Sequence, residues 1–118
     1  MMPCPLDPTV PVILVDPTEL GPTRLDTTHA FAVFGEGIEE PFIVVDKRLL
    51  DQEWFTEDHL LVILAHELAH IRCGSENEKL ADRVGMMLLR RAGYASAFRL
   101  HRAEYENRLA LGHYQQAA

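Results

Sequence analysis

The residues best suited to chemistry in this chain form the sequence His66-Glu67-Leu68-Ala69-His70. Residues four apart share one face of a helix, so both imidazoles can bind a single metal ion. Glu67 follows the first histidine directly, where its carboxylate can reach a water held by the metal. Two neutral nitrogen ligands and a base for that water suit hydrolysis assisted by zinc. A pattern of five residues is short, so its meaning depends on its surroundings.

A catalytic zinc site needs a third protein ligand, and the segment after the motif offers one. Glu78 and Asp82 are four apart, hence on one face of a second predicted helix. Gly74 lets the chain reverse sharply between the two helices, so His70 and Glu78 can meet at the turn. Asp82, one helical turn further on, would lie near His66. There it could accept the other ring N–H and fix the tautomer.

These residues also have interpretations that need no metal. Glu78 could close a capping box with Ser75, which stands three residues earlier. Asp82 taken alone is typical of a solvated helix charge. Glu76 is a rival third ligand, but it would lie on a different helical face from Glu78.

The composition is that of an ordinary globular protein: 118 residues, 47% hydrophobic and 25% charged. Its length predicts one domain, residues 1–118. The net charge of −7 argues against nucleic-acid binding, which needs a basic footprint. The proline-rich start lacks the basic and apolar regions of a signal peptide. The longest apolar run, Leu60 to Ala65, is too short to span a membrane. Cys4 and Cys73 are predicted to be free thiols, and we expect a cytoplasmic protein without a membrane partner.

The first half of the chain predicts a small sheet of about three strands. Residues 1–9 are expected to be extended or loosely ordered. Apolar runs predict strands over residues 10–15, 29–34 and 41–45, and the last two should pair as a hairpin across a glycine-rich break.

The second half predicts three helices, so the fold class is α+β. A short helix over residues 47–54 precedes them. The main helix should begin after Thr56, a good N-cap, and run to about Arg72, with Gly74 as its stop. Ser75 is predicted to cap the next helix, which ends near residues 92–93. A third helix covers about residues 96–111.

With these residues in view, the chain resembles the gluzincin metallopeptidases, in which H-E-x-x-H precedes a glutamate ligand on a later helix. Asn77-Glu78-x-x-Ala81-Asp82 is similar to their N-E-x-x-S/A-D motif, as in thermolysin. A closer resemblance is to the peptidase core of the Ste24/HtpX family, although His29 stands where that family has asparagine. The matching segments are, in order, His29-Ala30-Phe31-Ala32, Phe42 to Val45, Leu49-Leu50-Asp51, Glu78-x-x-Ala81-Asp82-Arg83-x-Gly85 and Ala92-Gly93-Tyr94.

The resemblance implies a zincin-like fold: a small N-terminal sheet, an active-site helix, a glutamate-bearing helix and a C-terminal helix. It implies one zinc ion held by His66, His70 and Glu78. Glu67 would act as general base and then acid in peptide hydrolysis, and Asp82 would orient His66.

The resemblance also implies how a peptide or unfolded protein would bind. A strand would form the upper rim of the cleft, and an extended substrate could pair with it. A nearby donor should stabilise the oxyanion. The candidates are His101, Tyr94 and Tyr105, of which His101 is favoured because its helix follows the ligand helix. The substrate-binding residues would be His29, Ala30, Phe31, Ala32 and Val33.

Two other hypotheses stay open beside a zinc-dependent endopeptidase. In size the chain resembles the minigluzincins, which tend to inhibit themselves. Its C-terminal segment, residues 112–116, could close the cleft and carries His113 as a possible fourth ligand; self-association could block the cleft as well. The third hypothesis is a binding module with a structural zinc. Glu67 argues against it, because a structural site needs no base.

Overall fold

The computed structural model describes residues 1–19, 21, 23–26 and 28–116, and it has the predicted α+β architecture. Its sheet contains four strands: β1 (Met2–Cys4), β2 (Asp7–Val15), β3 (Ala30–Val33) and β4 (Phe42–Asp46), in the order β1-β2-β4-β3. β3 and β4 form the predicted antiparallel hairpin, whereas β2 and β4 run parallel. β3 therefore lies at an edge of the sheet, with one side paired to β4.

The N-terminal segment adds a strand that the sequence did not predict. Most of residues 1–9 is extended, as expected, but the segment turns at residues 5–6 and is paired: β1 runs antiparallel to β2, with Met2 opposite Val12. Cys4 is fully buried against the core at the end of this strand. Pro3 suits such a place, because β1 lies at an edge of the sheet, where a missing N–H is tolerated.

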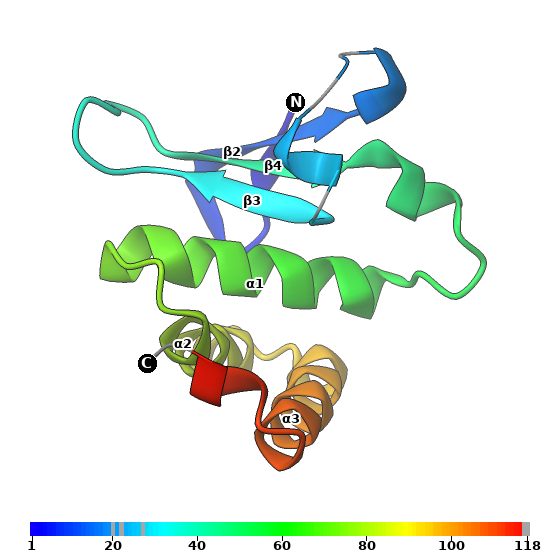
Figure 1. Cartoon of the computed structure of the whole chain (residues 1–118), viewed down its shortest axis with the longest axis vertical. Coiled ribbons are helices and arrows are strands. Elements are labelled where there is room, and N and C mark those ends of the chain that lie inside the picture. The colour runs from blue at the N-terminus through cyan, green and yellow to red at the C-terminus, as the bar shows by residue number, and fades with distance from the viewer. Residues whose placement is uncertain (20, 22, 27, 117–118) are drawn as a thin grey trace.

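Three helices follow the sheet, and the first lies at the centre of the molecule. Figure 1 shows α1 (Glu57–Cys73) between the sheet on one side and α2 (Glu78–Arg91) and α3 (Ala95–Ala110) on the other. This position explains why α1 is apolar on more than one face. Leu64 and Leu68 pack toward the sheet, whereas Leu61 and Ala65 pack toward α2 and α3.

The ends of these helices follow local chemistry, with one correction. Thr56 caps α1 as predicted, and Gly74 ends it in the left-handed conformation, with φ of 58°. Ser75 does not cap α2. Its N-cap is Asn77, whose side chain accepts a hydrogen bond from the Leu80 N–H. Asn is as good a cap as Ser, and the turn after Gly74 uses the Ser75 hydroxyl to accept from the Asn77 N–H instead.

Four short 3-10 turns complete the described chain: η1 (Pro17–Glu19), η2 (Arg24–Asp26), η3 (Lys47–Asp51) and η4 (His113–Gln116). η3 occupies part of the predicted helix over residues 47–54. Both cysteines are free thiols. Within the described ranges, no helix is long and apolar enough to cross a membrane.

Candidate metal centre

The two histidines of α1 point at the same place. Their Nε2 atoms are 3.1 Å apart, because residues one helical turn apart carry their side chains on one face. Each ring is held at its other nitrogen: His66 Nδ1 lies 2.7 Å from Asp82 Oδ1, and His70 Nδ1 lies 2.7 Å from the Ser75 carbonyl oxygen. The fold therefore fixes both imidazoles before any ligand binds.

Glu78 completes the cluster from the first turn of α2. One of its carboxylate oxygens lies 3.2 Å from His66 Nε2 and the other 2.8 Å from His70 Nε2. The turn through Gly74 brings the end of α1 to the start of α2, as the sequence predicted. Over the part of the chain that the structure describes, His66, His70 and Glu78 are the one set of three or more candidate ligands whose donor atoms gather within 4.8 Å. Glu76, the rival ligand, is not in it.

The chemistry of this donor set fits a cation. A carbonyl oxygen only accepts, so His70 must donate from Nδ1, and its Nε2 in the neutral ring is a bare acceptor. The same holds for His66, whose Nδ1 faces an ionised carboxylate. Two nitrogen lone pairs and a carboxylate thus face one point. In a tetrahedral zinc site with Zn–N of 2.0–2.1 Å, neighbouring ligand atoms would be about 3.3 Å apart, close to the spacing seen here.

Without a metal, protons balance the same cluster. Burial opposes a charge on His66, but hydrogen bonds to Asp82 and Glu78 outweigh it and raise its pKa to about 10. Burial likewise opposes a charge on His70, and hydrogen bonds to Glu78 and the Ser75 carbonyl raise its pKa. The hydrogen bonds from His66 and His70 hold the pKa of Glu78 far below its usual value. Protons and a metal ion would therefore compete for this site.

Glu67 lies beside the cluster without joining it. Its carboxylate is 4.0 Å from His66 Nε2 and is largely buried under β3. Burial raises the pKa of Glu67 to about 7, although the histidines and the Ala32 N–H act in the opposite direction. A carboxyl group that titrates near neutrality suits a residue that takes up and returns a proton. A bound cation would lower this pKa.

Asp82 is buried behind His66 and holds more than that ring. Its Oδ1 accepts from His66 Nδ1, as predicted, while Oδ2 accepts from Arg108 Nη1 at 2.9 Å and from the Tyr114 hydroxyl. Burial opposes ionisation of Asp82, but hydrogen bonds from His66 and Tyr114 outweigh it and lower its pKa.

His101 lies in the wall of a cleft that runs past the cluster, behind the exposed surface. Its ring is fully buried, with Nε2 3.9 Å from Asp82 Oδ1. Both ring nitrogens lack a hydrogen-bond partner among the described residues. Burial lowers the pKa of His101 to about 4, so the ring is neutral at pH 7. Of the rival donors, Tyr94 packs against the α1–α3 core and Tyr105 packs against Tyr114.

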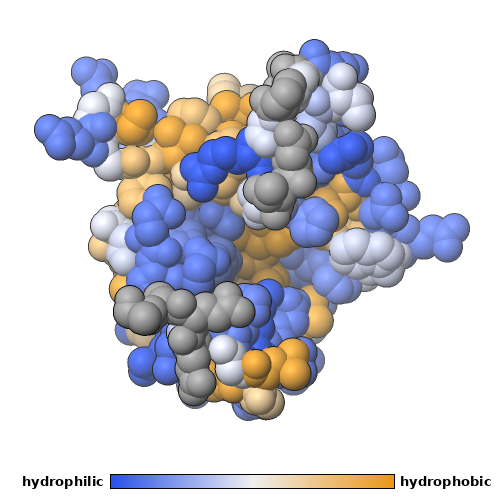
Figure 2. Space-filling model, in the orientation of Figure 1, coloured by the Kyte–Doolittle hydropathy of each residue, from blue (hydrophilic) through white to orange (hydrophobic). Residues whose placement is uncertain are grey.

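A cleft of about 400 Å³ runs past the cluster, between β3 and the helices. Figure 2 shows hydrophobic surface gathered on the floor of this hollow, with hydrophilic residues around it. At one end, the Trp54 ring meets those of Phe55 and His59 edge to face, at centroid distances of 5.6 and 5.5 Å. The other lining residues include Thr28, His29, Ala30, Leu49, Val62, Ile63, Glu104, Arg108, His113 and Tyr114.

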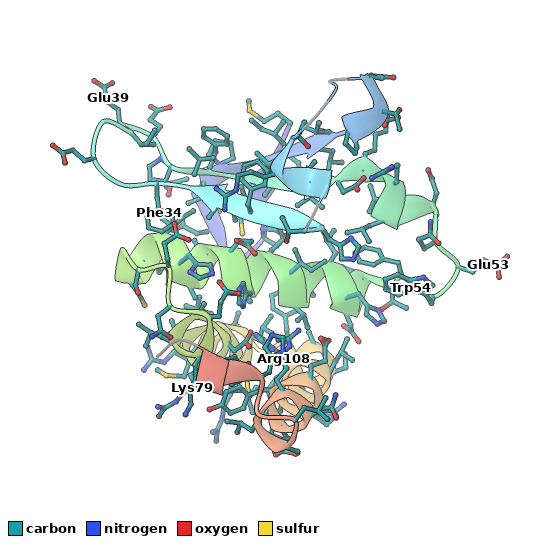
Figure 3. All side chains as sticks on the ribbon, in the orientation of Figure 1. Phe34, Glu39, Glu53, Trp54, Lys79 and Arg108 are labelled. Carbon is teal, nitrogen blue, oxygen red and sulfur yellow. The ribbon has the colours of Figure 1, made fainter. Side chains whose placement is uncertain are left out.

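A second hollow, of about 210 Å³, lies on the other side of the cluster. It shares Ala30, Glu67 and Glu78 with the larger cleft, so the two form a groove along β3. Phe34 lines it and stacks on His70 at a centroid distance of 6.4 Å. In Figure 3, Phe34 and Trp54 lie at opposite ends of α1.

Three residues of this region were not singled out by sequence as part of the site. Arg108 belongs to a helix rich in charged residues, and nothing local marks it as the one that reaches Asp82. Tyr114 was noticed only as part of a C-terminal segment. Trp54 stands between two elements, in a loop without a periodic signal. Of these three, only Trp54 could have been noticed in the sequence, because it is an aromatic residue shortly before the helix that carries His66 and His70.

The comparisons with known proteins agree with this geometry. The model of peptidase family M48 matches residues 21–108, which include the candidate ligand cluster, Glu67 and Asp82. The match covers well over half of the chain, and the chain therefore belongs to peptidase family M48, a family of metal-dependent peptidases. Searches among curated proteins and among solved structures gave no match.

Proposed function

We propose that this chain is a zinc-dependent endopeptidase that cleaves peptides or unfolded protein. The observation that carries the proposal is the convergence of three candidate metal-ligand side chains beside a buried carboxyl group, in a groove under the edge strand β3. His66, His70 and Glu78 would hold one zinc ion. When bound, zinc would supply Lewis-acid chemistry, making water more acidic and polarising the scissile carbonyl.

Glu67 would perform the proton transfers. Its carboxylate lies at the cluster yet makes none of the close contacts of a ligand, which leaves it able to take a proton from the attacking water. It would then return that proton to the leaving amine. Its buried position supports both roles, because a pKa near neutrality balances uptake and release.

The substrate would lie extended along β3. The Ala32 N–H points toward Glu67, whereas the His29 carbonyl bonds to Asp46 of the sheet. By strand alternation, the backbone of Ala30 and Ala32 therefore faces the groove, and that of His29, Phe31 and Val33 faces β4. A peptide added at this edge would place its carbonyl near the cluster.

A latent peptidase, like the minigluzincins, is the second candidate. His113 and Tyr114 line the larger cleft, so the C-terminal turn is near enough to limit access. Deletion after Leu111, assayed with zinc in saturating excess, or dilution of a self-associated form, would then raise peptidase activity severalfold. Unchanged or lower activity would exclude this candidate.

The decisive test of the leading proposal is Glu67→Gln. Removing the base should lower kcat for a quenched fluorescent peptide by at least about 10²-fold, since general base catalysis contributes 10²–10⁴. About one equivalent of zinc should stay bound, because Glu67 is not a ligand. Glu39→Gln, the same change at an exposed position between β3 and β4 that lines neither hollow, is the matched control. Wild-type protein that binds no zinc on titration would refute the proposal.

A further inference from the structure

The buried carboxylate of Asp82 joins four separate elements. It stands on α2 and is 1% exposed. It accepts from His66 of α1 through Oδ1, and from Arg108 of α3 and Tyr114 of η4 through Oδ2. Figure 3 shows Arg108 pointing from α3 toward α1. The orientation of a metal-ligand imidazole therefore depends on a contact with the C-terminal turn.

The two bonds at Oδ2 restrict the carboxylate. A carboxylate with one accepted bond can rotate about its Cβ–Cγ bond, whereas one fixed at both oxygens cannot. With Oδ2 held by a guanidinium and a phenol, Oδ1 stays aimed at His66 Nδ1. Charge-assisted bonds of this kind are stronger than neutral ones and also keep the carboxylate ionised.

Tyr114 reaches this position through specific packing. Gly112 adopts φ of 68°, which turns the chain after α3 back toward the cleft. The Tyr114 ring then packs against Tyr105 of α3, with centroids 5.8 Å apart. Tyr114 lies beyond residue 108, where the family match ends, so membership of the family does not account for it.

We propose that Tyr114 is a positioning residue of the metal centre: its hydroxyl fixes Asp82, and Asp82 in turn fixes His66 for the metal. The C-terminal turn is then a structural part of the site as well as one wall of its cleft. This inference rests on the proposed function, because it requires that the cluster binds a metal.

The test is the zinc affinity of Tyr114→Phe, which removes only the hydroxyl. Losing a group that orients a metal-ligand histidine typically weakens metal affinity by about 10–100-fold. Tyr114 acts only through Asp82, and it shares Oδ2 with Arg108. We therefore expect its loss to weaken zinc binding by roughly 3–10-fold. Competition with a chromophoric chelator measures it, and the visible spectrum of the Co²⁺-loaded protein should change. Tyr105→Phe, the same change on the neighbouring ring, should leave both readouts at wild-type values.

A double-mutant cycle with Asp82→Asn tests the route of the effect. If Tyr114 acts through Asp82, Tyr114→Phe should change zinc affinity little in the Asp82→Asn background. An equal loss in both backgrounds, an unchanged affinity in Tyr114→Phe, or an equal loss in Tyr105→Phe would overturn the inference. Each of these leaves zinc binding by the wild type intact, whereas a wild type without zinc binding refutes the proposed function itself. Tyr114→Phe also leaves the C-terminal turn in place, so a change in zinc affinity cannot come from unblocking the cleft.

Discussion

His66 and His70 differ in what holds their second ring nitrogen. His70 donates to a backbone carbonyl at the turn between α1 and α2, which no side-chain change removes. His66 donates to a side chain, Asp82, whose own contacts extend to α3 and η4. Of the two histidines, His66 is therefore the one whose orienting contact a side-chain substitution can change, and such contacts orient a ligand and set its basicity.

His101 offers a prediction at the scale of single residues. If its unpartnered ring donates to the oxyanion, His101→Asn should lower kcat by about 10²–10³-fold, which is the loss typical of removing one oxyanion donor. KM should change little. Steady-state kinetics on the folded variant measures this. A residue that only fills space would show normal kcat and a reduced free energy of unfolding, which would remove His101 from the catalytic assignment.

At the scale of elements, α1 and α2 approach closely at Gly85. A Cβ added there would lie 3.0 Å from His101 Nε2 and 3.2 Å from the Ala65 backbone. The backbone of α1 is buried between two layers and cannot retreat easily. This close approach gives a physical reason for the glycine in the Glu78-to-Gly85 motif.

Gly85→Ala has two effects of opposite sign on the free energy of unfolding. Helix propensity alone would stabilise the variant by up to about 1 kcal/mol. Overpacking in a filled interior costs about 1–3 kcal/mol, and we expect it to win by roughly 1 kcal/mol because backbone atoms are involved. Urea unfolding followed by circular dichroism measures the difference. A variant more stable than the wild type would show that the two helices can separate at little cost.

The aromatic corner before α1 is a second feature at this scale. Trp54 is 56% exposed at the cleft and is the single tryptophan of the chain. Its fluorescence should change when the Glu67→Gln variant binds a peptide with a bulky apolar residue. Trp54→Ala should raise KM for that peptide about 3–10-fold, the effect of losing some 50 Å² of apolar contact. Leu50→Ala, an exposed apolar residue outside the cleft lining, is the control.

At the scale of the whole molecule, the candidate metal site lies on a scaffold that packs independently of it. One core cluster lies between the sheet and α1, and the other between α1 and the last two helices. Neither includes His66, His70 or Glu78. We therefore expect the metal to stabilise an already folded chain rather than to fold it, unlike a zinc finger.

Chelation of the metal tests this expectation. Zinc at 1,000 times its Kd should contribute about 4 kcal/mol to stability. For a chain of this size, that corresponds to a Tm shift of roughly 10–20 °C. Far-ultraviolet circular dichroism at 25 °C should stay unchanged without metal, and scanning calorimetry should record the shift. Glu78→Gln should reduce the shift. Loss of the helical signal on chelation would show that the metal is needed for folding.

The sequence by itself determined the parts of this protein that depend on local spacing. Four-residue intervals place His66 with His70 and Glu78 with Asp82, and Gly74 ends α1 where the two pairs can meet. Alternating apolar residues likewise predicted the β3–β4 hairpin. Each of these depends on periods of two or about 3.6 residues, which are visible in any short window.

Only the tertiary structure decided which distant residues meet. The pairing of the N-terminal segment as β1, the full burial of His101 and the convergence of Arg108 and Tyr114 on Asp82 all join residues far apart in the chain. No local period encodes such contacts, because they arise when α2 and α3 pack on the same side of α1 and bury a charge that must then be satisfied.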